Sequence, residues 1–168
     1  MSQDLGQLYD EHAPALFAFL LNLTRNEPDT RDILQEVFLK LVRNALRTDG
    51  IREIRAWLLR TAHRQAIDTM RRRASHARAI DRAAAEPAEP FAPADDPDGQ
   101  TFRDAVSAAM RELPGEQRAV VHLKLWEDMT FAEIAATLGI SANTAASRSR
   151  YALDQLGDLL RPLHDQRP

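Results

Sequence analysis

The chain has no cysteine among its 168 residues, and only 6% of them are aromatic. Without thiols it forms neither disulfides nor thiolate metal sites, and a reducing compartment suits it. No apolar run is long enough to span a membrane, and the acidic, polar start MSQDLGQLYDEHAP is unlike a signal peptide. We therefore expect a folded cytoplasmic protein without membrane insertion.

Signatures of catalysis are missing as well. The sequence contains no glycine-rich phosphate loop, no nucleophile elbow and no convincing acid–base pair. The five histidines have no metal-ligand spacing: His12, His63, His76, His122 and His164. We expect neither an enzyme nor a bound cofactor or metal ion.

Charge is unevenly distributed along the chain, although the net charge is only −3. Residues 55–82 contain eight arginines and two aspartates, whereas residues 83–100 contain five acids and no basic residue. This segregation predicts a local phosphate-binding surface rather than a uniformly basic protein.

A proline-rich acidic segment divides the chain. Its sequence, AAAEPAEPFAPADDPDGQ, contains four prolines that oppose a helix and acids that oppose a core. We interpret residues 83–101 as an extended tether between an N-terminal domain, residues 1–82, and a C-terminal domain, residues 102–168. The alternative is a surface loop inside one domain, which is disfavoured because structureless loops of this length are uncommon there.

The rest of the sequence has helical periodicity, so the expected fold is all-α with two small helical domains. A first helix covers residues 5–23, with a kink or break at Pro14. A second begins with a cap at Asp29 or Thr30, and a third runs over about residues 54–73. Further helices are expected near residues 102–113 and 116–126. The second helix has this expected core stripe: Ile33, Leu34, Val37, Phe38 and Leu41.

Residues 130–156 have the pattern of a helix-turn-helix. Thr130 and Glu133 form a capping box, and Gly139 stands where a helix ends with a positive φ. Ser141 then caps a second helix. This order is typical of DNA-binding motifs, although an ordinary helical hairpin is the alternative.

The second helix of this motif has two different faces. One side carries Ala145, Ser149, Ala152 and Leu156, which are expected to pack inward. The other side offers hydrogen-bonding and cationic groups suited to base edges and phosphates, unless it is simply a solvated face. Its DNA-contact candidates are Asn143, Thr144, Ser147, Arg148 and Arg150.

Two faces in the N-terminal half are also candidates. On the second helix, Asp32, Gln35, Glu36 and Leu39 recur at helical spacing, either as a solvated face or as a protein-docking face. On the third helix, arginines suit phosphate contact because the planar guanidinium pairs two oxygens at once. These arginines are Arg60, Arg64, Arg71, Arg72 and Arg73.

Four segments, taken in order, resemble the extracytoplasmic-function (ECF) sigma factors of the sigma-70 superfamily. They are ILQEVFLKL (33–41), AWLLRTAHRQAIDTMRRR (56–73), LPGEQRAVVHL (113–123) and TFAEIAATLGISANTAASRSRYAL (130–153). Members of this family are small two-domain initiation factors of bacterial RNA polymerase.

The resemblance implies roles for the candidate residues. Asp32, Gln35, Glu36 and Phe38 would dock on the clamp helices of core RNA polymerase. The arginines of the third helix would contact promoter DNA at the minus-10 element, and the helix-turn-helix would recognise the minus-35 element. An anti-sigma factor is a further partner that the family implies.

Some residues depart from the family pattern. Arg64 stands where the family often has asparagine, and Asn143 and Ala146 differ from the common Gly-Thr-Val-Lys-Ser-Arg start of its recognition helix. The promoter sequence therefore cannot be transferred from a relative. Two alternatives are a sigma mimic that occupies an anti-sigma factor and a stand-alone helix-turn-helix regulator that binds an operator without polymerase.

Overall fold

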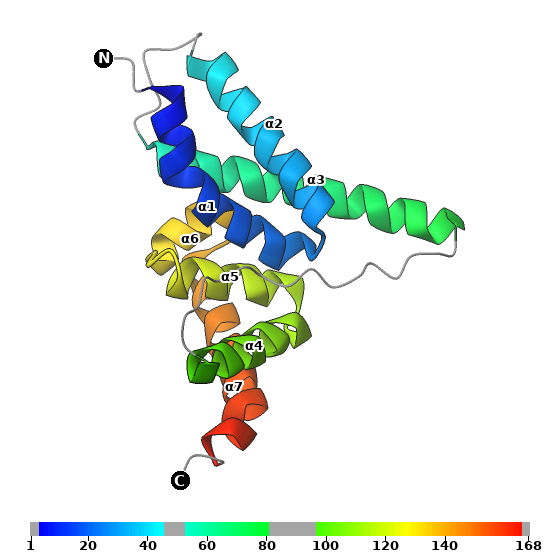
Figure 1. The fold of residues 1–168 in the computed structure, drawn as a ribbon, viewed down its shortest axis with the longest axis vertical. Coiled ribbons are helices and arrows are strands. Elements are labelled where there is room, and N and C mark those ends of the chain that lie inside the picture. Colours follow the sequence, from blue (N-terminus) through cyan, green and yellow to red (C-terminus); the bar gives the residue numbers. More distant parts are fainter. Residues whose placement is uncertain (1–3, 46–52, 81–96, 166–168) are drawn as a thin grey trace. The chain divides into compact units, whose positions relative to one another are not determined.

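The computed structural model describes residues 4–45, 53–80 and 97–165, and these ranges contain seven α-helices and no strand (Figure 1). The expected all-α fold is confirmed. The chain divides into two compact units, Met1–Ala88 and Glu89–Pro168. Most of the expected tether, residues 83–96, lies outside the described residues. Its last part, residues 97–101, is not extended but forms the start of helix α4 (Pro97–Glu112), because proline is tolerated at the first position of a helix.

The first unit is a three-helix bundle. Helices α1 (Leu5–Thr24), α2 (Glu27–Ala45) and α3 (Ile54–Ile80) each pack against the other two. The stripe expected on α2 is buried in full, together with these residues of α1 and α3: Leu16, Phe19, Leu20, Leu58, Leu59, Ala62 and Ala66.

Helix α1 runs through Pro14 without a break. Proline in a helix interior removes one backbone hydrogen bond and costs about 3 kcal/mol or more. Here Ala13 and Leu16, on either side of the proline, are both buried. Tertiary packing of the apolar face therefore outweighs the local cost of Pro14.

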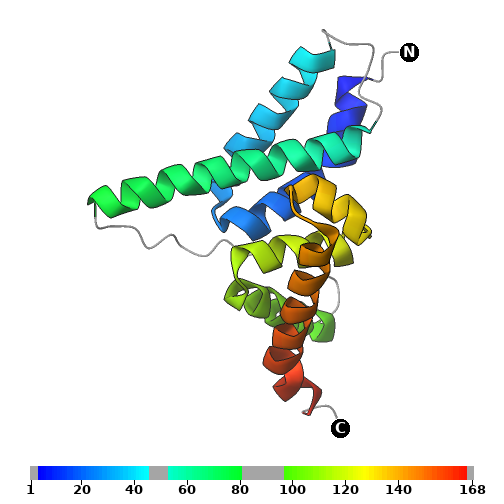
Figure 2. The same ribbon diagram turned by 180° about the vertical axis from the view of Figure 1, so that it is seen from behind.

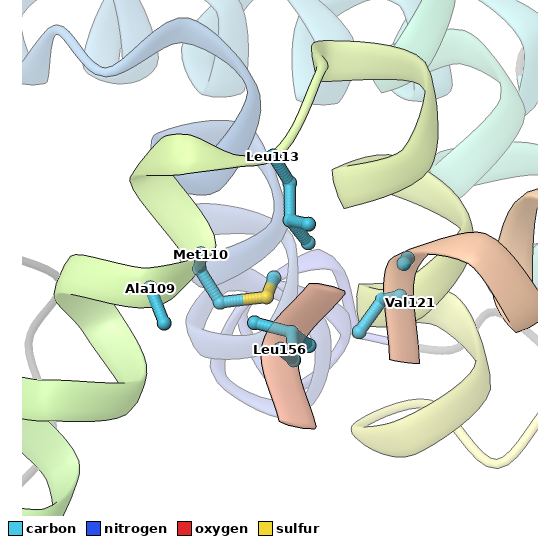
Figure 3. Close-up of a cluster of buried hydrophobic side chains, with 6 residues drawn as sticks. Ala109, Met110, Leu113, Val121 and Leu156 are labelled. Atoms are coloured by element: carbon cyan, nitrogen blue, oxygen red, sulfur yellow. The ribbon is translucent and has the colours of Figure 1, made fainter. Parts of the chain in front are cut away.

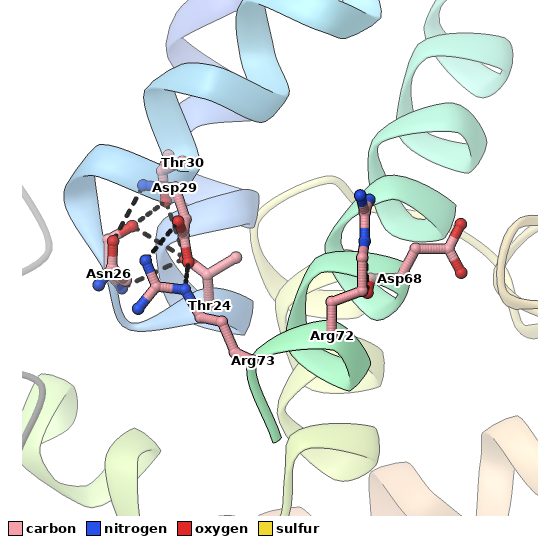
Figure 4. Close-up of polar contacts among 7 residues, drawn as sticks. All are labelled: Thr24, Asn26, Asp29, Thr30, Asp68, Arg72 and Arg73. Carbon is pink, nitrogen blue, oxygen red and sulfur yellow. Dashed lines mark hydrogen bonds and ion pairs between the residues drawn. The ribbon is translucent and has the colours of Figure 1, made fainter. Parts of the chain in front are cut away.

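The start of α2 differs from the expected cap. The side chain of Asn26 accepts a hydrogen bond from the backbone N–H of Asp29 at 2.9 Å, which is the contact of an N-cap residue. Thr30 lies inside the helix, fully buried, and its hydroxyl donates to the Asn26 carbonyl at 2.8 Å (Figure 4). Asn26 caps α2, and the expected cap at Asp29 or Thr30 is wrong.

Helix α3 continues beyond the expected end at Arg73 to Ile80. No proline or glycine occurs between these two residues, so nothing in the local sequence ends the helix. The end of α3 projects past α1 and α2 (Figure 2), and residues 71–77 are all exposed. The arginine-rich stretch is thus presented on a helix rather than on a loop.

The second unit is built around its last helix. Helix α7 (Ala142–His164) packs against α4 (Pro97–Glu112), α5 (Gly115–Leu125) and α6 (Phe131–Leu138). One hydrophobic cluster joins three of these helices (Figure 3). Its buried members are Ala109, Met110, Leu113, Val121, Ala152 and Leu156.

The helix-turn-helix is formed by α6 and α7 as expected. Thr130 accepts from the Glu133 N–H at 3.2 Å, and the Glu133 carboxylate accepts from the Thr130 N–H at 2.7 Å. Gly139 ends α6 with φ +69°, and Ser141 caps α7 by accepting from the Thr144 N–H at 3.0 Å. These local contacts set the start of α7, the helix that carries the DNA-contact candidates.

Candidate nucleic-acid and protein interfaces

The candidate DNA-contact face of α7 points away from the helix's buried side. Ala145, Ser149, Ala152 and Leu156 are buried, as expected. On the other side, Asn143 and Arg150 are exposed, whereas Thr144, Ser147 and Arg148 are partly buried. The burial of one side fixes the rotation of α7 and so determines which side chains are presented to solvent.

Not all of these polar groups are equally available. The Thr144 hydroxyl accepts a hydrogen bond from the Ser141 hydroxyl at 2.8 Å, within the cap of α7. Arg148 Nη2 lies 3.0 Å from Glu116 Oε2, an ion pair that links α7 to the first turn of α5. Arg150 lies over the ring of Tyr151, with its guanidinium carbon 5.3 Å from the ring centre. Asn143 and Arg150 are therefore the most outward members of the set.

The arginines of α3 differ in exposure. Arg60 is partly buried, and its Nε has no hydrogen-bond partner among the described residues. Arg64, Arg71 and Arg72 are exposed. Arg72 Nε also donates to the carbonyl of Asp68, one turn earlier, at 3.4 Å (Figure 4). The exposed guanidinium groups lie along α3 and at its projecting end, where an extended anion such as a nucleic-acid backbone can approach.

Arg73 reaches back across the unit to α2. Its Nη2 donates to Asp29 Oδ1 at 2.6 Å, and its Nε pairs with Asp29 Oδ2 (Figure 4). The Asp29 side chain is only 13% exposed, so this contact satisfies a largely buried carboxylate. Two parallel contacts occupy one edge of the guanidinium. Arg73 thus fastens α3 to the start of α2, which the sequence did not indicate.

Replacement of Arg73 by alanine is expected to destabilise the N-terminal unit by about 1–2 kcal/mol, because Asp29 loses its partner while largely buried. Replacement of exposed Arg71 and Arg72 is expected to change stability by less than about 0.5 kcal/mol. Urea unfolding followed by circular dichroism measures both. An Arg73→Ala protein as stable as the Arg71→Ala, Arg72→Ala double variant would contradict the anchoring role of Arg73.

The residues of the candidate docking face on α2 also differ in exposure. Asp32 and Gln35 are exposed, and Glu36 is partly buried at 4.0 Å from Arg43. Phe38 is buried, and its ring lies 4.7 Å from that of Tyr9 on α1. Phe38 therefore shapes the surface from beneath, while the three polar residues form it.

An apolar groove runs beside this face, between α1 and α2. Its volume is about 740 Å³, and Gln35 and Phe38 are among its lining residues. Leu5, Tyr9 and Leu39 also line it and are 44%, 46% and 43% exposed. Only the packing of α1 on α2 shows that Leu5 and Tyr9 border an open groove.

Two histidines have a lowered pKa because they are buried. Burial lowers the pKa of His122 on α5 to about 4, and its ring stacks on Trp126 with the ring centres 5.4 Å apart. Burial, with a smaller contribution from Arg64, lowers the pKa of His63.

Among the residues that the structure describes, no group of three or more His, Asp or Glu side chains is placed to hold a metal ion. None of the described helices is both long and apolar enough to cross a bilayer.

Family models match both halves of the chain. The model described as sigma-70 region 2 matches residues 8–76, and that described as sigma-70, region 4 matches residues 103–156. The chain is 31% identical to the ECF RNA polymerase sigma factor SigL of Mycobacterium tuberculosis, over 89% of this chain and 84% of that protein. It is also 31% identical to the RNA polymerase sigma factor CarQ of Myxococcus xanthus, over 91% of this chain and 87% of that protein.

Solved structures show the same fold. The sigma factor RpoE of Bartonella quintana, in complex with the anti-sigma factor NepR, has a TM-score of 0.76 and 24% identity over 95% of this chain and 98% of that one. CnrH in complex with the cytosolic domain of CnrY has a TM-score of 0.65 and 23% identity over 94% of this chain and 88% of that one.

Proposed function

The chain belongs to the extracytoplasmic-function sigma factors of the sigma-70 family, and from this premise we propose that it directs core RNA polymerase to specific promoters and assists DNA melting without catalysing a reaction itself. The observation that carries the proposal is the presence of both sigma modules, in order, in one chain. A stand-alone repressor needs only the second of them.

The C-terminal module would read the minus-35 element through α7. Asn143 suits adenine, since its amide donates to and accepts from one base edge, and Arg150 suits guanine or a phosphate. Both side chains are exposed. The burial of Ala145 and Ala152 against the rest of the unit supports this orientation. Thr144, Ser147 and Arg148 would add contacts at the flank of the same helix.

The N-terminal module would act at the minus-10 element through α3. Arg64, Arg71 and Arg72 are exposed along the helix and offer guanidinium groups to the backbone of the duplex and of the separated strand. Capture of unpaired bases shifts the duplex equilibrium toward the open state. Arg60 would contribute from a partly buried position, and Arg73 would chiefly hold α3 in place.

Polymerase would make two weak DNA contacts act as one strong contact. Asp32, Gln35 and Glu36 on α2 are the proposed docking surface, supported from beneath by Phe38. We propose two functional domains, residues 1–82 and 97–168, joined by a tether over residues 83–96, because helix α4 already begins at Pro97. When both domains are held at the promoter spacing, the second contact forms at a high effective concentration.

The site of action and a further partner follow from the same proposal. If the chain recognises promoters together with core polymerase, it would act in the cytoplasm. The structurally similar sigma factor RpoE was solved in complex with an anti-sigma factor. We propose that a protein of this kind also binds and inhibits the present chain. A pull-down from the native host tests this, because polymerase subunits and an inhibitor would be recovered together.

The direct test is transcription in vitro by core polymerase with and without the chain, on a pool of genomic promoter fragments. We expect a discrete set of transcripts that requires the chain. A pool without any stimulated transcript would contradict the proposed function. Binding of one operator by the chain alone, with no effect of polymerase, would indicate a stand-alone regulator instead.

A further inference from the structure

The first turn of α5 places a carboxylate against the candidate DNA-reading helix. Glu116 Oε2 lies 3.0 Å from Arg148 Nη2. Residues 141–151, which include all the DNA-contact candidates of α7, contain no acid of their own. We propose that Glu116 competes with DNA phosphate for Arg148 and thereby lowers the affinity of the free chain for DNA of any sequence. This inference rests on the proposed function, because it takes Arg148 to face DNA.

The two partners of this ion pair differ in exposure. The Arg148 side chain is 27% exposed, whereas that of Glu116 is 73% exposed. Most of the Arg148 side chain is therefore enclosed by the unit, whereas most of the Glu116 side chain is in contact with water. Carboxylate and phosphate oxygens accept from the same guanidinium donors, and ion pairs with an exposed partner contribute little to stability. A phosphate can therefore replace Glu116 at Arg148 with little loss of folding free energy.

The position of Glu116 has a second physical explanation. An acid in the first turn of a helix interacts favourably with the helix dipole, and Glu116 is the acid in the first turn of α5. This effect acts on stability alone and does not depend on Arg148. A competitor for phosphate instead changes DNA affinity, and does so only while Arg148 is present. The two roles are therefore separable by experiment.

The charge balance of the second unit increases the importance of this pair. Residues 112–161 contain seven acids and five bases, and only Arg148 and Arg150 lie among the DNA-contact candidates of α7. With Glu116 against Arg148, Arg150 is the main cation presented by this face of the free chain. The cost of displacing Glu116 applies equally to every DNA sequence. DNA already held by polymerase overcomes that cost through its high effective concentration.

The test compares the full-length chain with its Glu116→Gln variant on a short random-sequence DNA duplex, by fluorescence anisotropy across a salt titration. We expect the variant to bind about three- to tenfold more tightly at low salt, with a salt slope steeper by up to about 0.9, the value for one added phosphate contact. The gain is expected to disappear in an Arg148→Ala background, because Glu116 acts through Arg148.

Asp158→Asn is the matched control. Asp158 pairs with Arg161 at 2.6 Å in the same unit, and both side chains are 70% exposed, so this variant makes the same charge change without freeing a DNA-contact candidate. A gain for Glu116→Gln no larger than that of Asp158→Asn, a loss of affinity, or a gain that persists without Arg148 would overturn the inference. Promoter-dependent transcription by the wild-type chain tests the proposed function separately, so a failure of the inference is distinguishable from a failure of the function.

Discussion

Replacement of Asn143 and Arg150 by alanine together is expected to lower promoter-dependent transcription by at least about 30-fold. Each side chain is proposed to contact the minus-35 element, and a good base contact is worth about 1–3 kcal/mol. Two losses of about 1 kcal/mol each multiply to about 30-fold. The measurement is run-off transcription by core polymerase on a promoter selected with the wild-type chain.

The double variant is expected to change DNA recognition without changing folding or polymerase binding. Asn143 and Arg150 are exposed, so the thermal unfolding of the protein is expected to stay unchanged. Core polymerase is still expected to retain the variant in a pull-down, because the proposed docking surface lies on α2. Arg161→Ala is the control, since Arg161 is an exposed arginine of the same helix. Transcription by the double variant equal to that by Arg161→Ala would exclude this face of α7 as the reader.

Acidification from pH 7 to about pH 4 is expected to destabilise the C-terminal unit by about 3 kcal/mol through His122 alone. Burial lowers the pKa of His122 from 6.5 to about 4, so the unfolded chain takes up a proton in this range before the folded chain does. The contribution of neutral His122 to stability is therefore fully present above about pH 6.5 and is lost as the pH falls toward 4. A change of this size is a large fraction of the stability of a small domain.

His122→Phe removes the titrating group and keeps a ring that can stack on Trp126. We expect the variant to lose most of the pH dependence between pH 6.5 and 4, whatever its stability at pH 7. A Trp57→Phe background leaves Trp126 as the only tryptophan, so its fluorescence in urea reports on the C-terminal unit without interference from His63 in the other unit. An equal loss of stability with and without His122 would assign the effect to other groups.

Several features of the fold were predictable because they depend on contacts close in sequence. The capping box of Thr130 and Glu133, the positive φ of Gly139 and the Ser141 cap all appear in the structure as expected. The inward face of α7, represented by Ala145 and Leu156, follows from helical periodicity. Such features arise from hydrogen bonds over two to four residues and from a regular repeat, both of which are visible in one segment.

Other expectations were wrong where tertiary contacts compete with local preference. Of the kink or break expected at Pro14, the break does not occur, since the residues around it are buried in the bundle, although α1 is bent partway along its length (Figure 1). The cap of α2 is Asn26, because Thr30 is drawn into the core and donates to the Asn26 carbonyl. Asp29, an equally good cap by its chemistry, is instead paired with Arg73 from α3.

The sequence by itself determined the helical fold, the order of the two sigma modules and the residue types that suit DNA and polymerase. Only the tertiary structure decided which of those residues are available. It directs Arg73 to Asp29 and Arg148 to Glu116, while it leaves Asn143 and Arg150 outward. Composition and periodicity describe one helix at a time, whereas each of these ion pairs joins two helices. The distribution of free and neutralised arginines therefore depends on how the helices pack.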